Sequence, residues 1–391
     1  MLSIGRTFGA LFLATVLMQL GATLLISYLA LRLNANGSST FWIGALAAAN
    51  ALGMAIGAGA GRVLIEWIGH VRAYAASTGL IVTAVLAHEF SAELPFWLVL
   101  RALAGLAMMC QLMVLESWLN ERASGTERGR VLGAYMSATY VGMVLGQLAL
   151  GAGNGLDGRV VAGVAAAFAL GLVPVALTRV PQPAVLPQLG PAFWPILRRL
   201  PQPILTVLVS GMINSSFFGL AVIYARRQGL APDEIGSFLA MPVAAGLLAQ
   251  VPLGLLSDRI PRVRLIRGVA VLLALACVAL GVSRGLSPGV LLAFAFCIGL
   301  LQFCLYPLGA AYANQQVEPE RRVALAGVLL TTFGIGSCIG PLLAGAWMEW
   351  ANPSALYYFF AACAVLLVAA VGRERPGTAA RAAGEAHLLD T

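Results

Sequence analysis

The chain has 391 residues, a mean hydropathy of +0.88, and a composition that is 60% hydrophobic and only 10% charged. A soluble domain carries about 25% charged residues, so this chain cannot cover its apolar surface with polar side chains and must largely lie in lipid. Its net charge of +8 comes from arginines spread along the chain in small clusters, with no lysine. This spread argues against a nucleic-acid-binding surface.

Residues that build soluble catalytic sites are sparse. The three histidines lie in a loop, near the end of an apolar run and in the C-terminal tail, and no nucleotide-binding P-loop is present. All six cysteines lie within apolar runs, where they are expected to be small core side chains rather than a disulfide framework. The sequence therefore predicts neither an enzyme nor a cofactor.

The apolar runs predict an all-α membrane protein with twelve spans. Each span needs about 20 apolar residues at a rise of about 1.5 Å per residue. The first run is too long for a signal peptide and further spans follow it, so it is expected to be retained. The predicted spans are residues 7–31, 41–63, 71–89, 95–118, 131–153, 158–178, 203–225, 235–256, 265–283, 288–312, 323–347 and 353–372.

The distribution of arginine predicts the orientation. Eighteen of the 24 arginines fall in segments that are cytoplasmic when the N-terminus is inside. This bias follows the positive-inside rule and predicts a bacterial inner-membrane protein with both termini in the cytoplasm. The proline-rich connector predicts a linker, with a short interfacial helix around residues 193–200. The expected domains are an N-terminal six-helix bundle (1–178), a cytoplasmic linker (179–202), a C-terminal six-helix bundle (203–372) and a disordered cytoplasmic tail (373–391).

Glycines repeat between the two halves at a nearly constant offset. Three glycines of the fifth span recur 194 residues later in the eleventh span: Gly142, Gly146 and Gly151, then Gly336, Gly340 and Gly345. The halves are therefore expected to be parallel repeats related by a pseudo-two-fold axis, with a substrate path at their interface. Helix packing alone explains the same glycines equally well.

Charge is concentrated in one short segment, "GLLSDRIPRVR", residues 254–264. It places four charges in seven residues between two apolar runs, and topology and loop solvation account for much of that charge. The corresponding segment of the first half is "GRVLIEWIGHVR".

Taken together, these features resemble the major facilitator superfamily (MFS) of transporters over nearly the whole chain. The segment 254–264 is similar to the family's loop motif G-x-x-x-D-R-x-G-R-R/K, through Gly254, Asp258, Arg259 and Arg262, with Pro261 at the family's glycine. The first-half copy keeps a glycine and has an acid and an arginine in related places: Gly69, Glu66 and Arg72.

A second motif is displaced between the halves. "GSCIGPLLAG", which contains Pro341, resembles the Gly-Pro motif of the family's antiporter branches, but that motif belongs to helix 5, where this chain has Gln147. The resemblance implies a helix-packing role for Gly142, Gly146, Gly336, Gly340 and Pro341. Because the motif is displaced, the assignment to antiporters stays open.

The resemblance also implies a latch between the halves. In the family, the loop acid lies near a helix N-terminus of the opposite half, where an anion gains about 0.3–1 kcal/mol. Asp258 would then meet the start of helix 5 near Val131, and Glu66 the start of helix 11 near Val323. A solvated topogenic loop is the alternative. The expected gating residues are Glu66, Gly69, Arg72, Gly254, Asp258, Arg259 and Arg262.

Two charged residues lie well inside the fourth span. Ionisable groups in spans are costly and usually face a bundle interior or a cavity. Glu116 can exchange protons from a low-dielectric site and is the leading proton carrier; alternatively, it pairs with Arg122, Arg130 or a motif arginine as part of the latch. Arg101 with Gly105 resembles the helix 4 arginine motif of drug and proton exchangers, which implies a role in coupling.

Polar residues on helices 1, 4, 7 and 10 form the expected substrate cavity, because these helices line the cavity in the family. Ordinary interhelical hydrogen bonds are the alternative for each of them. The expected cavity residues are Gln19, Tyr28, Arg32, Gln111, Asn214, Tyr224, Gln302 and Tyr306.

The sequence thus predicts a secondary active transporter of a small solute that works by alternating access, is proton-coupled, and slightly favours efflux over uptake. The expected partners are the solute, protons and membrane lipid, without nucleic acid, and the expected state is a monomer. A non-transporting sensor or assembly protein is the alternative. A copper permease, suggested by the Met108, Met109, Cys110 and Met113 cluster, is a minor one because flexible apolar packing explains these side chains better.

Overall fold

The computed structural model describes residues 2–122, 128–151, 158–177, 198–318 and 321–371. The predicted tail and most of the predicted linker and interfacial helix lie outside these residues. The described residues of the first half form α1 (Leu2–Ala35), α2 (Thr40–Ile68), α3 (His70–Ala87), α4 (Leu94–Arg122), α5 (Arg128–Gly151) and α6 (Arg159–Ala176). Those of the second half form α8 (Pro201–Arg227), α9 (Pro232–Arg259), α10 (Arg262–Val282), α11 (Pro288–Gln302), α12 (Leu305–Asn314), α13 (Arg322–Trp350) and α14 (Ala355–Ala370).

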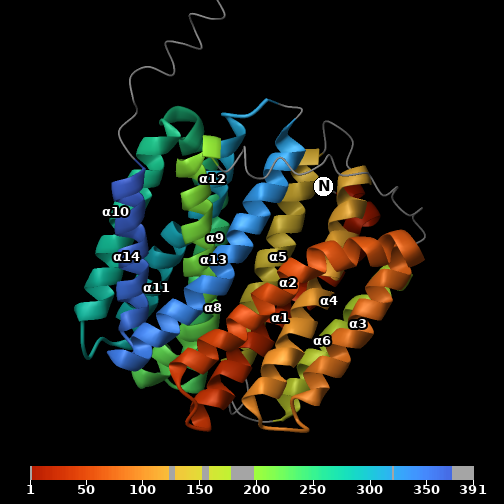
Figure 1. The fold of residues 1–391 in the computed structure, drawn as a ribbon, viewed down its shortest axis with the longest axis horizontal. Helices are drawn as coiled ribbons and strands as arrows, with labels where there is room; N and C mark the ends of the chain where they lie inside the picture. The colour runs from red at the N-terminus through yellow and green to blue at the C-terminus, as the bar shows by residue number, and fades with distance from the viewer. Residues whose placement is uncertain (1, 123–127, 152–157, 178–197, 319–320, 372–391) are drawn as a thin grey trace, which may run out of the picture.

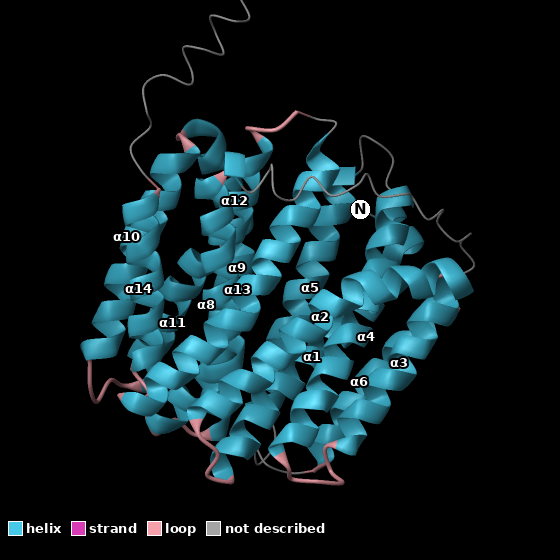
Figure 2. Ribbon diagram, viewed as in Figure 1, coloured by secondary structure: helices cyan, strands magenta, loops and turns pink. Residues whose placement is uncertain are grey.

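The helices form two bundles, which confirms the predicted all-α membrane architecture. Figure 1 shows α1–α6 in red to yellow beside α8–α14 in green to blue, and Figure 2 shows helices joined by short loops in the described residues. Ten helices of the described part are long and apolar enough to cross a membrane. The other two predicted spans correspond to α9 and to the shorter α14. In lipid, backbone N–H and C=O groups must hydrogen-bond within the protein, and helices satisfy this requirement internally.

Residues 288–312 form one continuous apolar run, which predicted a single helix, but the structure divides the run into two helices. α11 ends at Gln302 and α12 begins at Leu305, with a turn between them. Pro307 has no N–H to bond the carbonyl of Phe303, four residues earlier, and its ring crowds that carbonyl, which favours a kink or break at this point. The turn is closed instead by a bond from the N–H of Cys304 to the carbonyl of Leu301, 3.3 Å.

The glycine repeat has a physical counterpart in the helix contacts. A Cβ on Gly142 or Gly146 of α5 would lie 2.5 Å from a backbone carbonyl oxygen of α1, and one on Gly336 or Gly340 of α13 would lie 2.1–2.4 Å from one of α8. The pairs α5/α1 and α13/α8 are therefore the same contact in the two bundles, and small residues let the backbones approach this closely.

The two bundles meet most closely at one end, here called the packed end. A Cβ on Gly44 of α2 would lie 2.1 Å from the carbonyl oxygen of Pro341 in α13, and one on Gly236 of α9 would lie 2.8 Å from that of Gln147 in α5. Thr40 also donates to the carbonyl of Gly345, 2.8 Å. Toward the other end of the same four helices, called the opposite end, an added Cβ finds no neighbour within 4 Å at Gly59, Gly133, Gly254 and Gly327. The close glycine contacts between the bundles named here thus lie at the packed end.

Pro341 leaves one backbone carbonyl of α13 without its usual helical hydrogen bond, and a side chain of α8 supplies a replacement. A proline inside a helix leaves the carbonyl four residues earlier without its N–H partner, here that of Ser337. The hydroxyl of Ser215 on α8 donates to this carbonyl at 2.9 Å. Ser215→Ala should therefore leave the carbonyl unpaired and cost about 1 kcal/mol, seen as a lower Tm in detergent. Ser237→Ala is the matched control, because the half-buried Ser237 bonds to the carbonyl of Asp233 within α9; equal losses in both variants would contradict this account.

Candidate functional site

Glu116 lies near the end of α4 and is exposed although its helix spans the membrane. The hydroxyl of Tyr135, a buried residue of α5, donates to the Oε1 atom of Glu116 at 3.2 Å. Among the described residues, this phenol is the only hydrogen-bond or ion-pair partner of the carboxylate. The carboxyl group is therefore held by one neutral donor and keeps capacity for another partner.

Tyr306 of α12, on the other bundle, lies within electrostatic range of this carboxylate. The ring of Tyr306 packs edge-on against Phe333 of α13, with centroids 5.2 Å apart. Glu116, Tyr135 and Tyr306, called here the Glu116 site, thus come from both bundles.

A group of aromatic rings lies one helical turn or more deeper, toward the packed end. Phe303, at the break between α11 and α12, contacts Tyr140 of α5 at 6.0 Å, Phe217 at 6.3 Å and Phe218 at 6.0 Å, measured between ring centroids. These four residues are called the aromatic floor. The amide of Gln250 on α9 donates to the hydroxyl of Tyr140 at 3.1 Å, so a hydrogen bond also joins the bundles here.

Sequence reasoning missed the aromatic floor. Tyr140, Phe217, Phe218 and Phe303 sit in apolar runs, where an aromatic side chain gives no sign of which neighbour it faces. Pro307 was an available signal, because a proline favours a kink or break in its helix close to Phe303.

Arg101 lies in a different place from Glu116. The two positions are separated by about 22 Å along α4 at 1.5 Å per residue, so the structure does not join the two predicted coupling residues. The Arg101 side chain is 1% exposed, and its Nε and Nη1 atoms have no hydrogen-bond partner among the described residues. Arg101 is one turn after Trp97 and acts electrostatically on His88.

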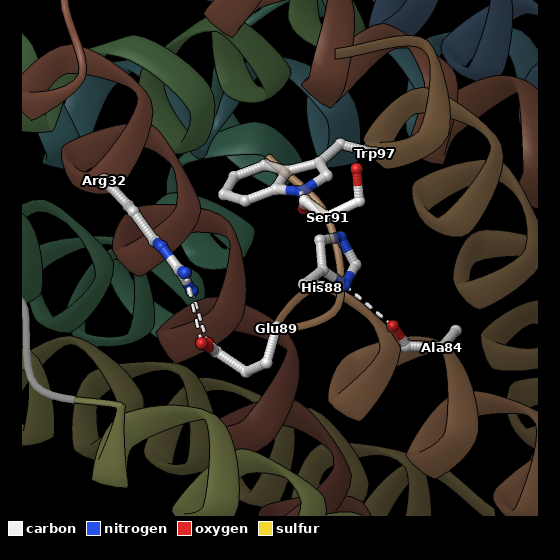
Figure 3. Close-up of polar contacts among 6 residues, drawn as sticks. All are labelled: Arg32, Ala84, His88, Glu89, Ser91 and Trp97. Atoms are coloured by element: carbon white, nitrogen blue, oxygen red, sulfur yellow. Dashed lines mark hydrogen bonds and ion pairs between the residues drawn. The ribbon is translucent and has the colours of Figure 1, made fainter. Parts of the chain in front are cut away.

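Several polar residues lie around Trp97 at the packed end (Figure 3). The guanidinium carbon of Arg32 lies 5.4 Å from the centre of the indole ring, and the ring of His88 meets it edge-on at 5.2 Å. Arg32 also pairs with Glu89 through its two terminal nitrogens, Nη1 and Nη2. The indole N–H of Trp97 donates to the carbonyl of Ser91 at 2.7 Å. Arg32 is therefore held in a structural ion pair on the first bundle.

His88 predicts a pH dependence of stability. Burial, with Arg101 as the next cause, lowers the pKa of His88 from 6.5 to about 4. The neutral ring is favoured in the folded protein, where Nδ1 bonds the carbonyl of Ala84 at 2.7 Å. Stability should thus be complete above pH 6.5 and fall as the pH drops from 6.5 towards 4, by about 3 kcal/mol at most. His88→Gln should flatten the Tm between these pH values; an unchanged acid limb would contradict this assignment.

Several predicted cavity residues are enclosed within one bundle. Gln111 is fully buried and its amide donates to Thr78 of α3 at 2.7 Å. Tyr224 is 0% exposed and packs against Tyr357 of α14, with ring centroids 4.7 Å apart. In this conformation both side chains pack against a neighbour in their own bundle, and their role in a cavity stays a prediction.

Among the other expected cavity residues, Tyr28 interacts with Arg32, one turn further along α1. The amide nitrogen of Asn214 reaches Ser210 on its own helix at 3.2 Å. Gln302 is fully buried at the end of α11, and neither amide atom has a partner among the described residues. Gln19 and Tyr28 are buried on α1. Of the expected set, Tyr306 is the residue that interacts electrostatically with Glu116 among the described residues.

The expected gating residues lie at the opposite end. Glu66 pairs with Arg62 on its own helix at 2.7 Å. Gly69 adopts φ 80° and ψ 167°, a conformation that is nearly restricted to glycine, and this allows α3 to start directly after α2. Arg72 and Arg259 are exposed, as is Gly254. Among these residues, the side chain of Asp258 lies outside the part that the structure describes.

Arg262 binds within the second bundle. It donates to the hydroxyl of Ser257 at 3.2 Å and to the carbonyl of Ala311 at 2.5 Å. Because Ala311 lies in the last turn of α12, the cation satisfies a terminal carbonyl and interacts favourably with the helix dipole. Pro261, which replaces the family's glycine, precedes α10 with φ −50° and needs no left-handed conformation.

Within the described residues, no three His, Cys, Asp or Glu side chains are grouped to hold a metal ion. Cys110 is buried and Cys297 is exposed on the second bundle. The described contacts therefore offer nothing specific in favour of a copper site.

Comparisons with known proteins agree with this architecture. An MFS-type transporter of Yersinia enterocolitica is 29% identical over 317 residues, which are 78% of this chain and 79% of the relative. An MFS-type transporter of Enterobacter sp. strain 638 is 31% identical over 273 residues, 69% of this chain and 70% of the relative.

Solved structures show the same fold at low sequence identity. The nucleoside transporter NupG superimposes with a TM-score of 0.79 at 14% identity, covering 95% of this chain and 98% of that one. A D-xylose-proton symporter gives a TM-score of 0.75 at 14% identity, covering 94% and 97%. The family model described as Major Facilitator Superfamily matches residues 11–231 and 203–389. The chain therefore belongs to the major facilitator superfamily.

Proposed function

We propose that this protein is a proton-coupled secondary transporter that moves a small solute by alternating access between its two bundles. The packed end then faces the outside and the opposite end the cytoplasm, as the arginine distribution favours, with both termini inside the cell. The tight contacts Gly44–Pro341 and Gly236–Gln147 support a closed outer side in this conformation. Since each contact joins the two bundles, a relative tilt of the bundles opens it.

One observation carries the coupling proposal: Glu116 is exposed within a span and its described partner is a phenol rather than an arginine. A carboxyl group in such a place can load and release a proton during each cycle. Two nearby titratable groups on helices packed against α4 are engaged elsewhere, since Arg62 pairs with Glu66 and His70 packs on Trp118.

The latch remains the competing role for Glu116. It requires an arginine partner at the cytoplasmic end. Arg130 is exposed and forms no ion pair in the described contacts, while the side chain of Arg122 lies outside the described residues. In this conformation Glu66 also engages Arg62 instead of the start of α13. We propose that the loop acids exchange these partners when the outer side opens.

Flux measurements on purified protein in proteoliposomes test the function. A solute found by thermal-shift screening should accumulate against its gradient when an inward or outward pH gradient is imposed, and a pH-sensitive dye should report counter-movement of protons in the case of efflux. Solute binding without any flux would instead favour a sensor. Solute flux that does not change with the pH gradient would show transport without the proposed proton coupling.

A further inference from the structure

Arg101 is a buried positive charge for which the described residues supply no negative partner. Its side chain is 1% exposed, and its Nε and Nη1 atoms donate no hydrogen bond. Of the two carboxylates in the segment between α3 and α4, Glu89 pairs with Arg32 and Glu93 is exposed. Burying an ion without a partner is costly, so the charge of Arg101 calls for compensation by a group outside these contacts.

A second unpartnered atom comes from the end of α3. The carbonyl of Ala84 can only accept, so Nδ1 of His88 carries the proton, and the buried Nε2 keeps a lone pair without a partner among the described residues. Two contacts place His88 beside Arg101. The ring packs on Trp97, one turn before Arg101 on α4, and Ala84 belongs to the same buried cluster as Leu100.

The second bundle shows that helix packing does not require this charge. Gly105 of α4 and Gly299 of α11 make the same contact in the two bundles, since a Cβ on either would lie 2.1 Å from a backbone atom of α2 or of α9. Four residues before these glycines stand Arg101 and Ala295, and both are buried. An alanine fills the equivalent place, so the arginine contributes something other than packing.

One functional group matches both unpartnered atoms. An oxygen of a carboxylate accepts from the guanidinium and supplies the missing negative charge. The second oxygen reaches Nε2 of His88 through one proton, which either group can carry. A chloride ion offers the charge without a second oxygen, and a water molecule offers hydrogen bonds without the charge. The pair Arg101 and His88 therefore selects a carboxyl group.

The surroundings limit the size of the ligand. Arg101, His88 and Trp97 are each at most 1% exposed, so the ligand is enclosed and must be small. The side chains next to them, where α3 meets α4, are small and apolar, and an apolar wall of this kind accepts a short alkyl group. They include Ala84, Ala87 and Ala104.

We propose that Arg101 and His88 form a binding site for a short monocarboxylate within the first bundle. One oxygen of the ligand binds the guanidinium, the other shares a proton with Nε2, and the alkyl group lies against the alanines of α3 and α4. The inference goes beyond the proposed transport function, because binding here needs neither flux nor Glu116, about 22 Å away along α4.

Acetate and acetamide, which have nearly the same shape and differ in charge, test the proposal. Each is titrated into the full-length protein, purified in detergent without carboxylates, at neutral pH and at an ionic strength held constant with sodium sulfate. Acetate should raise the Tm of wild type saturably, by about 3 °C near full occupancy. Acetamide should leave the Tm unchanged, and sodium chloride should bind at least tenfold more weakly than acetate.

Four variants assign the effect to the site. Arg101→Met should abolish the effect of acetate, and its Tm without acetate should equal or exceed that of wild type, because an uncompensated buried charge is gone. Arg101→Lys should retain part of the effect. His88→Phe, which keeps a ring against Trp97, should weaken acetate binding several-fold and tests the site even if Arg101→Met does not fold. Arg226→Gln, at an exposed arginine of α8, is the matched control and should respond as wild type does.

Two results would overturn the site: equal responses of wild type to acetate and acetamide, or an acetate effect of full size in Arg101→Met. Loss of the effect in Arg226→Gln would also contradict it, since acetate would then act through surface charge in general. Glu116→Gln should bind acetate as wild type does, so the outcome at this site does not depend on proton-coupled transport.

Discussion

Gly44→Ala is expected to keep the packed end from closing and to reduce transport at least tenfold. The added Cβ would lie 2.1 Å from the carbonyl oxygen of Pro341 and 2.9 Å from its carbonyl carbon. Both are backbone atoms, so neither can rotate away as the tip of a flexible side chain could. The substitution therefore costs the closed arrangement of α2 and α13 far more than it costs an arrangement in which these helices are apart, and populations shift accordingly.

Distances between spin labels at Asn36→Cys and Trp350→Cys report this change. The two positions lie on different bundles at the packed end, and both are exposed. The background replaces the exposed Cys297 and the half-buried Cys338, since the other four cysteines are buried. Gly44→Ala should move the distance distribution to longer values in the resting protein, together with the loss of flux.

Gly59→Ala is the matched control, because it lies on the same helix and its added Cβ finds nothing within 4 Å. It should leave both distance and flux near wild type. Gly236→Ala, the repeat counterpart of Gly44, should have a smaller effect, because its nearest backbone atom is 2.8 Å away rather than 2.1 Å. A Gly44→Ala protein with wild-type distances and flux would contradict the view that this contact closes the outer side.

The spans and the repeat could be predicted from sequence because their causes are local. A backbone in lipid must satisfy its own hydrogen bonds, so long apolar runs indicate helices without knowledge of any neighbour. The glycine offset was equally visible, since close helix approaches need small residues at fixed spacing. The contacts of Gly44 with Pro341 and of Gly236 with Gln147 show that the displaced Gly-Pro motif occupies the repeat-equivalent place at the bundle interface.

The cavity could not be read in the same way. A polar residue in a span indicates only that it avoids lipid, and it can meet that need within its own bundle, as Gln111 does with Thr78. The rotation of a helix about its axis decides whether the polar group faces a cavity or its own bundle. Packing against several neighbouring helices sets that rotation. The Trp97 cluster needed three separate segments, α1, α4 and the end of α3, to meet at one point. The sequence does not show that these three segments pack together.

Glu116→Gln is expected to abolish the pH dependence of uphill transport while downhill exchange at saturating solute stays within about tenfold of wild type. The amide keeps the size of the carboxyl group and can still accept the hydrogen bond from Tyr135, so the local packing survives. What it loses is the ability to take up and release a proton. Transport driven by a pH gradient then has no carrier, whereas solute exchange down its own gradient needs only the path.

Counterflow and pH-driven uptake in the same proteoliposomes distinguish this role from a latch. A latch at Glu116 predicts loss of downhill exchange as well, with recovery when the charge at Arg122 or Arg130 is changed to match. Glu116→Asp should keep part of the coupling, since a shorter carboxylate still titrates, and Glu93→Gln should keep all of it. If uphill transport by Glu116→Gln remained as dependent on pH as in wild type, the proton would have to travel by another group. The buried Arg101, about 22 Å away along α4, would then be the next candidate.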